Sequence, residues 1–314
     1  MGFGVPLQGA HKTGLGSSAA LVTAFTAAVL AYYLPVEASI INTAVGKARI
    51  HNLAQAAHCS AQGKIGSGFD VAAAVYGSCV YRRFDPAILK RIGEVGSPDF
   101  AKRLRMAVDD DGPVKIWDTH IDKSSVSMPK GLRLVMCDVD CGSETPGMVK
   151  KVFEWRKEIP EEAMLLWATL QKGNEDLARE LRDLTKTAST STASYENLSE
   201  IILTIRSLIR EMSAKARVPI EPDVQTDLID ACCQVSGVIG GVVPGAGGFD
   251  AIALLIEDHQ ETVDELDKFL AAYKVNSKDP DQKTIGKVRL LGVKQDMVGI
   301  RAEGVDIYKG WLEN

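Results

Sequence analysis

The sequence has no excess of basic residues and therefore little to indicate a nucleic-acid partner. Its 314 residues include 36 Lys and Arg against 41 Asp and Glu, which gives a formal net charge of −5 at pH 7. A protein that binds nucleic acid usually carries a clearly basic surface, so this balance argues against that class. Local groups of Lys and Arg can still form an anion-binding cleft in a chain with a negative overall charge.

Paired cysteines of the CxxC kind are absent as well, and no histidine spacing resembles a zinc site. Most of the six cysteines stand in apolar stretches such as Val135-Met-Cys137, which predicts buried free thiols in a reducing compartment. No basic region followed by an apolar run opens the sequence, so we expect no secretory signal. The long apolar stretch after Gly16 is rich in Ala and Thr, which favours a buried core helix over a membrane span. We therefore expect a soluble, cytoplasmic protein with no membrane partner.

The signatures of the best-known nucleotide-binding folds are also missing. The chain contains no GxxxxGK[ST] motif, which argues against a Walker-type phosphate loop, and it lacks the HRD and DFG elements of protein kinases. Its first glycine turn reads GLGSSA rather than GxGxxG, which is a poor fit to a Rossmann enzyme. The hydrophobic fraction of 46% is that of an ordinary globular protein, and the length suggests about two domains.

What the chain has instead is three glycine-rich turns. The first runs from Gly14 to Gly16 and leads through Ser17 and Ser18 into a long apolar helix. The free N–H groups and the positive dipole end at a helix start favour an anion, typically a phosphate. Lys12 adds a positive charge beside the turn, and the serine hydroxyls suit a phosphate or a magnesium ion. A turn that only caps a core helix would have the same sequence, so this stretch alone leaves both interpretations open.

The second and third turns add an acidic residue and a possible second contact surface. Residues 62–77 bring Asp70 to the start of a short helix, where it could cap that helix or serve as a general base. The third turn, residues 237–250, is so rich in glycine that a ligand or another backbone is expected to approach it closely. Ser143 and Thr145 stand at a further predicted helix start, where they could contact a substrate or only cap the helix.

The remaining pattern predicts an α+β chain with helices packed against one sheet and no internal repeat. A buried strand at 131–139 starts a second structural unit. The other expected helices and strands are helix 17–34, helix 40–61, strand 78–84, helices 160–185, 195–217 and 222–235, strand 251–256, helix 261–273 and strand 287–293.

GLGSSAA and its long helix resemble the phosphate-binding motif of the GHMP small-molecule kinases. Within that superfamily, His11–Leu21, Gly63–Ala72 and Val243–Ile252 are similar to the motifs of eukaryotic, especially fungal, phosphomevalonate kinases. The resemblance covers essentially the whole chain. It implies a partial N-terminal β/α ATP-binding domain over residues 1–130 and a ferredoxin-like C-terminal domain over 131–314, because members carry strands before GLGSSAA that are not found here.

The resemblance also implies a reaction, which is transfer of the ATP γ-phosphoryl group to (R)-5-phosphomevalonate, giving 5-diphosphomevalonate in the mevalonate route to isoprenoids and sterols. Asp70 would be the catalytic carboxylate, and Lys12 and Lys64 would supply positive charge, with Arg82 and Arg83 as further candidates. The ATP phosphates would lie against Gly14, Leu15, Gly16, Ser17, Ser18 and Ala19, with Ser17 or Ser18 near Mg²⁺. The substrate side would be shaped by Gly245, Ala246, Gly247 and Gly248, with Ser143 and Thr145 as weaker candidates.

Two departures from the family pattern keep other interpretations open. Mevalonate kinases carry a glutamate ligand for magnesium upstream of the catalytic aspartate, whereas residues 58–62 here contain no carboxylate. We assign no role to His51 or His58. Without the usual strands before the first turn, the long helix would expose apolar surface. The chain could therefore be a catalytically defective kinase-like protein with a ligand-binding or structural role. Another GHMP kinase is a further alternative, which the stretch at 64–72 disfavours.

Overall fold

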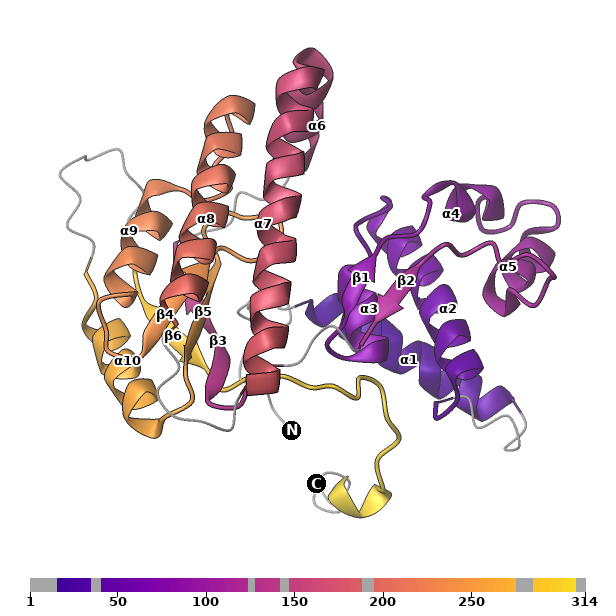
Figure 1. The fold of residues 1–314 in the computed structure, drawn as a ribbon. Helices are drawn as coiled ribbons and strands as arrows, with labels where there is room; N and C mark the ends of the chain where they lie inside the picture. Colours follow the sequence, from indigo (N-terminus) through magenta and orange to yellow (C-terminus); the bar gives the residue numbers. More distant parts are fainter. Residues whose placement is uncertain are drawn as a thin grey trace. The chain divides into compact units, whose positions relative to one another are not determined.

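The computed structural model describes residues 16–34, 41–123, 128–141, 147–187, 195–274 and 285–308 (Figure 1). They form two compact units, the first built from 16–123 together with 295–308 and the second from 128–294. The structure thus places 295–308 with the first unit, whereas the division made from the sequence puts them in the second. No helix of the described residues is long and apolar enough to span a membrane.

The first unit is mainly helical. Helices α1, α2 and α3 pack on one another around a small core that includes Ala19, Ile50 and Val71. Strands β1 and β2 form an antiparallel pair, and α4 and α5 lie between them in the chain. The bounds are α1 Ser17–Tyr33, α2 Ala44–Gln62, α3 Phe69–Tyr76, β1 Val80–Arg82, α4 Ala87–Ile92, α5 Phe100–Asp109, β2 His120–Asp122 and the short 3₁₀ helix η3 Val305–Tyr308.

Local sequence explains where α2 begins and ends. The hydroxyl of Thr43 accepts a hydrogen bond from the amide of Gly46 at 3.0 Å, which satisfies one of the free donors at the helix start. Gly63 ends the helix in the left-handed conformation, with φ of 63°, which glycine adopts without a steric penalty. Helix α2 therefore starts a few residues later than the helix expected at 40–61.

Helix α1 is buried on one face only. Small residues such as Ala19 and Ala27 pack against α2 and α3. On the other face Leu21, Phe25 and Tyr32 are 71%, 69% and 81% exposed. The expectation of a helix buried on most sides is therefore wrong for the described residues, because only α2 and α3 make extensive contact with α1 and no strand covers its outer face.

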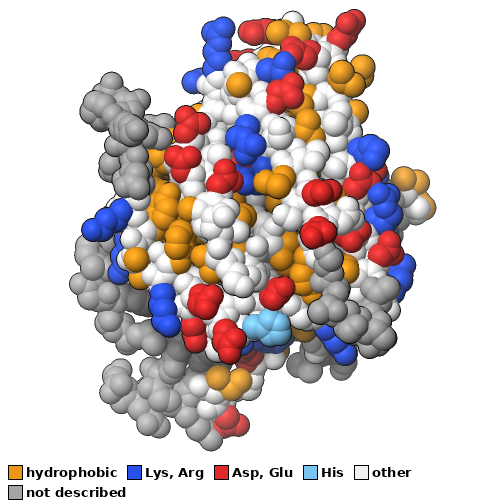
Figure 2. Space-filling model, turned by 60° about the vertical axis from the view of Figure 1, so that its left-hand side comes forward, with side chains coloured by type: hydrophobic (Ala, Val, Ile, Leu, Met, Phe, Trp, Pro, Cys, Tyr) orange, Lys and Arg blue, Asp and Glu red, His pale blue; other side chains and the backbone are white. Residues whose placement is uncertain are grey.

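The second unit is a four-stranded antiparallel sheet in the order β4-β5-β3-β6, with helices on both faces (Figure 1). Acidic, basic and hydrophobic side chains are interspersed over the surface shown in Figure 2. The bounds are β3 Leu132–Val139, α6 Met148–Glu158, α7 Pro160–Thr187, α8 Glu196–Ala216, α9 Asp223–Cys232, β4 Val238–Val242, β5 Ala251–Glu257, α10 Gln260–Ala272 and β6 Val288–Leu291.

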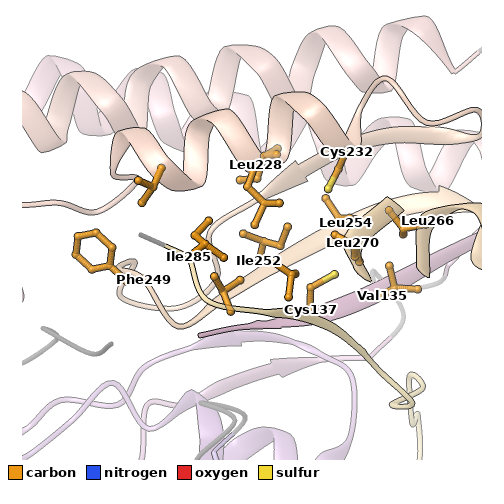
Figure 3. Close-up of a cluster of buried hydrophobic side chains, with 14 of the residues drawn as sticks. Val135, Cys137, Leu228, Cys232, Phe249, Ile252, Leu254, Leu266, Leu270 and Ile285 are labelled. Atoms are coloured by element: carbon orange, nitrogen blue, oxygen red, sulfur yellow. The ribbon is translucent and has the colours of Figure 1, made fainter. Parts of the chain in front are cut away.

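The sheet of this unit is buried on both faces. Ile252 and Leu254 of β5 point toward α9 and α10, where Leu228 and Cys232 lie over them (Figure 3). The next residue of the strand, Leu255, packs with Ile202 of α8 on the opposite face. Successive side chains of a strand alternate between the two faces, so a strand covered on both sides needs a continuous apolar run. The buried strands predicted at 131–139 and 251–256, and the α+β fold class, are thereby confirmed.

Strand β4 was not expected, because it lies inside the third glycine-rich stretch. A Cβ added at Gly241 would lie 2.4 Å from Cδ2 of Leu254, and one at Gly240 would lie 3.0 Å from Cγ2 of Ile202. These two glycines allow close packing of β4 against its neighbours. Helices α4 and α5 were also missed, although Phe100, Leu104 and Ala107 of α5 recur at helical spacing.

Candidate functional site

The start of α1 has the geometry of an anion site. Gly16 is its N-cap, with φ of 75°, and no side-chain hydrogen bond caps the helix among the described residues. The carbonyl of Gly16 accepts from the amide of Ala20 at 3.0 Å, so the helix is regular from its first turn. The amides of Ser17, Ser18 and Ala19 have no intrahelical partner, as at the start of any helix. Lys12, Gly14 and Leu15 lie outside the described residues.

Asp70 lies directly beside this helix start. A Cβ added at Gly16 would be 3.4 Å from Cβ of Asp70, so the structure brings the first and second glycine turns together. The N-cap of α3 is Gly68, with φ of 76°, and Asp70 is the second residue of the helix. Its Oδ1 accepts from the amide of Val71 at 2.9 Å. Gly68 occupies the N-cap position without a capping side chain, whereas Asp70 accepts from an amide in the first turn of α3 and also stands beside Gly16.

Ser18 contacts a histidine to which the sequence assigned no role. Its Oγ lies 3.1 Å from Nε2 of His58, and Nε2 also lies 2.9 Å from the side-chain nitrogen of Gln62. An amide nitrogen can only donate, so His58 Nε2 acts as an acceptor in this arrangement. The Ser18 hydroxyl then donates to His58, which leaves its oxygen lone pairs available to a ligand. The i, i+4 spacing of His58 and Gln62 on α2 is a sequence signal for the contact between those two side chains.

Gln55 and Tyr81 hold the second glycine turn from two sides. The side-chain nitrogen of Gln55 donates to the carbonyl of Gly68 at 2.7 Å, and Tyr81 Oη donates to the carbonyl of Ser67 at 3.2 Å. A Cβ at Gly68 would lie 2.7 Å from Nε2 of Gln55 and 2.8 Å from Tyr81 Oη. Only glycine fits here, so the motif glycine is required by packing. Burial, which dominates over the opposing charge of Arg83, raises the pKa of Tyr81.

Gln55 is itself held by a buried histidine. His51 Nε2 lies 3.2 Å from the side-chain nitrogen of Gln55, and its Nδ1 lies 3.1 Å from Oδ1 of Asn52. Burial lowers the pKa of His51 to about 4, so the ring is neutral at physiological pH. The chain of contacts from His51 to Gly68 therefore joins the middle of α2 to the N-cap of the helix that carries Asp70.

The two candidate cations of the second turn differ in their contacts. Lys64 is exposed, and its side chain makes no recorded hydrogen bond or ion pair with a described residue, Asp70 included. Arg83 is partly buried, and its Nη2 donates to the carbonyl of Ile65 at 3.2 Å. Arg83 thus supports the loop that leads to Asp70, whereas the catalytic role of Lys64 stays a prediction.

The third glycine turn lies in the second unit and is fixed by the segment before α9. The amide of Gly248 donates to the carbonyl of Ile220 at 2.9 Å. A Cβ at Gly247, which has φ of 83°, would lie 2.3 Å from that same oxygen. The side-chain nitrogen of Gln225 donates to the carbonyl of Phe249 at 2.6 Å. Gly245 and Ala246 form the exposed tip of the turn, while Ser143 and Thr145 lie outside the described residues.

A buried ionic cluster stands behind this turn. Nη2 of Arg206 lies 2.8 Å from Oε1 of Glu221 and its Nη1 lies 2.6 Å from Oδ1 of Asp230; the side chains of Arg206 and Glu221 are each 1% exposed. Arg210 and Thr226 also donate to Glu221 Oε1, each at 3.0 Å. Buried charges persist only when they are paired and hydrogen-bonded. Because Glu221 follows Ile220, this cluster fixes the backbone against which the third turn packs.

Two models of one family match the chain. The GHMP kinases N terminal domain matches residues 5–78, and the GHMP kinases C terminal domain matches residues 157–274, which together make more than half of the chain. Among solved structures, the fold is similar to a Lin0012 protein from Listeria innocua, with a TM-score of 0.60 and 22% identity over 92% of this chain and 71% of that one. It is also similar to Streptococcus pneumoniae phosphomevalonate kinase, with a TM-score of 0.56 and 18% identity over 83% of this chain and 68% of that one.

Two relatives with higher sequence identity than these structures are both named phosphomevalonate kinase. Phosphomevalonate kinase erg8 of Aspergillus fumigatus is 50% identical over 311 residues, which are 99% of this chain and 64% of the relative. Phosphomevalonate kinase of Gibberella zeae is 50% identical over 310 residues, which are 99% of this chain and 66% of the relative. The chain thus spans just under two thirds of the length of these relatives. With both halves of the family pattern matched, the chain belongs to the GHMP kinase family.

Proposed function

We propose that this chain carries the catalytic machinery of an ATP-dependent kinase that converts (R)-5-phosphomevalonate to 5-diphosphomevalonate. The observation that carries the proposal is the approach of Asp70 to the start of α1, where 3.4 Å separate the Cβ of Asp70 from a Cβ built on Gly16. A carboxylate beside a free helix start supports the proposal. The two relatives at 50% identity, both named phosphomevalonate kinase, support the substrate.

The phosphates of ATP would bind at the start of α1. The free amides of Ser17, Ser18 and Ala19 and the positive end of the helix dipole suit them, and no side chain competes as a cap among the described residues. Gly14 and Leu15 would continue this cradle, and Lys12 would add charge to it. Such a site gains its strength from preorganised donors that need no rearrangement when the nucleotide binds.

The neighbouring carboxylate calls for a cation in the same place. Asp70 beside a polyphosphate would be repelled unless a positive ion lay between them. Mg²⁺ is commonly coordinated by one or two protein oxygens together with phosphates and waters. The oxygen atoms of Asp70, Ser17 and Ser18 could supply such ligands. Among the described residues no group of three or more His, Cys, Asp and Glu could hold a metal. When bound, Mg²⁺ would neutralise charge that develops on the transferred group.

Positioning carries most of the chemistry in this proposal. The attacking oxygen belongs to a phosphate that is already acidic, so Asp70 need not remove a proton and can instead orient the reactants. Lys12 and Lys64 would offset the negative charge of the two phosphate compounds. Ser143 and Thr145 would contact the acceptor, and the tip of the third turn at residues 245–248 would line its side.

The test is ATP-dependent release of ADP by this chain with phosphomevalonate, mevalonate or galactose as acceptor. We expect turnover with phosphomevalonate and a fall in kcat of about 10²-fold or more for Asp70→Asn, because the neutral amide no longer orients the reactants and their cation. Asp111→Asn, in an exposed turn of the same unit, is the matched control. Turnover with mevalonate alone would overturn the substrate, and an Asp70→Asn variant as active as the control would overturn the site.

A second function is favoured by the exposed face of α1. Leu21, Phe25 and Tyr32 leave apolar surface uncovered. A kinase-like protein that binds nucleotide without catalysis would have this feature. Calorimetry with ADP separates the two, because binding at the α1 site without turnover of any acceptor supports the binding protein.

A further inference from the structure

The first unit contains a cavity of about 620 Å³ between α2, α4 and α5. We propose that this cavity binds a small amphipathic anion, a molecule with an apolar chain and a phosphate or carboxylate head. Among the described residues, Lys64 is the one residue that this cavity shares with the nucleotide and acceptor sites of the proposed function.

The body of the cavity is apolar. Leu53 and Ala56 of α2 form one wall, Leu89 and Ile92 of α4 a second, and Phe100 and Leu104 of α5 a third. Small-molecule sites typically have volumes of about 300–1,000 Å³, mostly apolar walls and a few polar groups that fix orientation. The volume and the walls therefore suit a chain of methylene groups, which gains free energy by leaving water.

Charged side chains stand at the edge of this cavity. Lys64 and Lys90 contribute two positive charges and Glu94 one negative charge, and all three are exposed. Neither lysine side chain is recorded in an ion pair or hydrogen bond with a described residue. Lysine can lie along apolar surface while its ammonium group stays in water. The net positive charge of these three side chains favours an anionic head group over a neutral or cationic one.

The cavity lies on a different face of α2 from the phosphate site. Ala56, Ser60 and Gly63 line it at helical spacing, whereas His58 and Gln62 turn toward Ser18. Residues two apart in a helix point about 200° from each other, so these two sets face nearly opposite directions. An occupant of the cavity would not displace a phosphate at Gly16.

One wall of the cavity belongs to the second glycine turn. Gly63, Lys64 and Ile65 line it, and the chain runs on from them to Asp70. A Cβ at Gly63 would meet nothing within 4 Å, so the backbone borders open space there. The carbonyl of Ile65 is held by Arg83 from the other side at 3.2 Å. An occupant would restrain this loop, and we expect slower amide hydrogen exchange at residues 63–70 when it binds.

The experiment is calorimetric titration of the intact chain, without nucleotide or acceptor, using decyl phosphate below its micelle-forming concentration. Decanol and decyltrimethylammonium are the neutral and cationic probes of equal chain length. We expect decyl phosphate to bind about tenfold or more tightly than decanol, as charge-assisted hydrogen bonds to the lysines require. The ammonium probe should bind more weakly than decanol.

Four variants locate the binding. Ala57→Trp fills the cavity from an exposed position of α2 and should abolish binding. Lys90→Met should weaken decyl phosphate about two- to fivefold and Glu94→Gln should strengthen it by a similar factor, since exposed charges contribute modestly. Lys102→Met, an exposed lysine of α5 outside the cavity, should change nothing.

Two results would overturn the proposal whatever the kinase assay shows. One is equal affinity for the anionic and neutral probes; the other is unchanged binding in Ala57→Trp. Because the outer face of α1 is also apolar, Phe25→Ser tests that surface. Loss of binding in Phe25→Ser with retention in Ala57→Trp would place the probe on α1 and reject the cavity.

Discussion

Three side chains of different chemistry meet at the start of α1: the hydroxyl of Ser18, the imidazole of His58 and, beside Gly16, the carboxylate of Asp70. His58 is 6% exposed and accepts from both Ser18 and Gln62. By accepting the hydrogen bond of the Ser18 hydroxyl, it leaves the serine lone pairs available to a phosphate or cation. We infer that His58 is a positioning residue for the hydroxyl.

Replacing His58 should therefore affect nucleotide binding more than turnover. In His58→Ala the Ser18 hydroxyl loses its acceptor, and we expect the KM for MgATP to rise about three- to tenfold, in line with about 1 kcal/mol for one hydrogen bond. His58→Gln retains an acceptor and should recover most of the loss. Steady-state kinetics at varied ATP are the measurement. Equal effects of the two variants would show that the ring serves only for packing.

The buried His51 predicts a dependence of stability on pH. Its pKa is lowered by burial to about 4 in the folded chain, against about 6.5 when unfolded. Between these values the unfolded state binds more protons, so the stability of the first unit falls as pH drops from 6.5 to 4. The loss is about 3 kcal/mol at most. Hydrogen exchange of α2 amides across this range measures it, with His51→Gln as the variant that should flatten the dependence.

At the scale of elements, the third glycine turn owes its conformation to α9 and the residues before it. The Ile220 carbonyl receives the Gly248 amide, and the buried pair Arg206–Glu221 holds the adjoining backbone. The sequence marks the glycines, but it does not mark the residues that fix them. Gln225 and Glu221 lie outside every motif, and only their contacts identify them.

Two glycines of this turn provide a matched test. Gly247 and Gly245 both have positive φ, at 83° and 67°. An added Cβ would lie 2.3 Å from Ile220 O at Gly247 but would meet nothing within 4 Å at Gly245. We expect Gly245→Ala to cost about 1 kcal/mol for backbone strain alone, and Gly247→Ala at least about 2 kcal/mol more because the backbone of Ile220 must move. Thermal unfolding compares them, and equal losses would contradict the packing argument.

At the scale of the whole molecule, the chain leaves the first unit after residue 123 and returns to it at residue 295. The amide of Ser78 donates to the carbonyl of Asp296 at 2.8 Å, and that of Ile300 donates to the carbonyl of Val75 at 3.1 Å. These bonds attach the returning segment to the end of α3. The helix that carries Asp70 is thus supported by residues more than two hundred positions away in the sequence.

A substitution at Gly299, where the returning segment contacts the residue after α3, should destabilise the first unit selectively. A Cβ at Gly299, which has φ of 70°, would lie 2.4 Å from the amide nitrogen of Gly77, so Gly299→Ala cannot keep this approach. We expect α3 amides to exchange at least about tenfold faster, which corresponds to a loss of about 1.4 kcal/mol, while amides of β3 in the second unit are unchanged. Equal acceleration in both units would show that the segment does not act on α3 alone. Gly304→Ala, which meets nothing within 4 Å, is the control.

Much of the fold was predictable because its signals are local. The apolar runs of β3 and β5 and the amphipathic spacing of α8 and α10 predict those elements within a few residues. Strand β4 was hidden because its two central glycines read as a turn, although packing against Leu254 and Ile202 is what requires them. Helix α4 was hidden because it has only six residues, whereas α5 carries helical spacing at Phe100, Leu104 and Ala107 and was wrongly left out.

By itself the sequence determined the three glycine turns, the position of Asp70 after the second of them and the family, because glycine and helix-start patterns depend on neighbouring residues. Only the tertiary structure decided that Asp70 stands against Gly16, that His58 contacts Ser18 and that residues 295–308 support α3. These contacts join segments far apart in the chain, and they follow from how helices pack. No local pattern of residues encodes that packing.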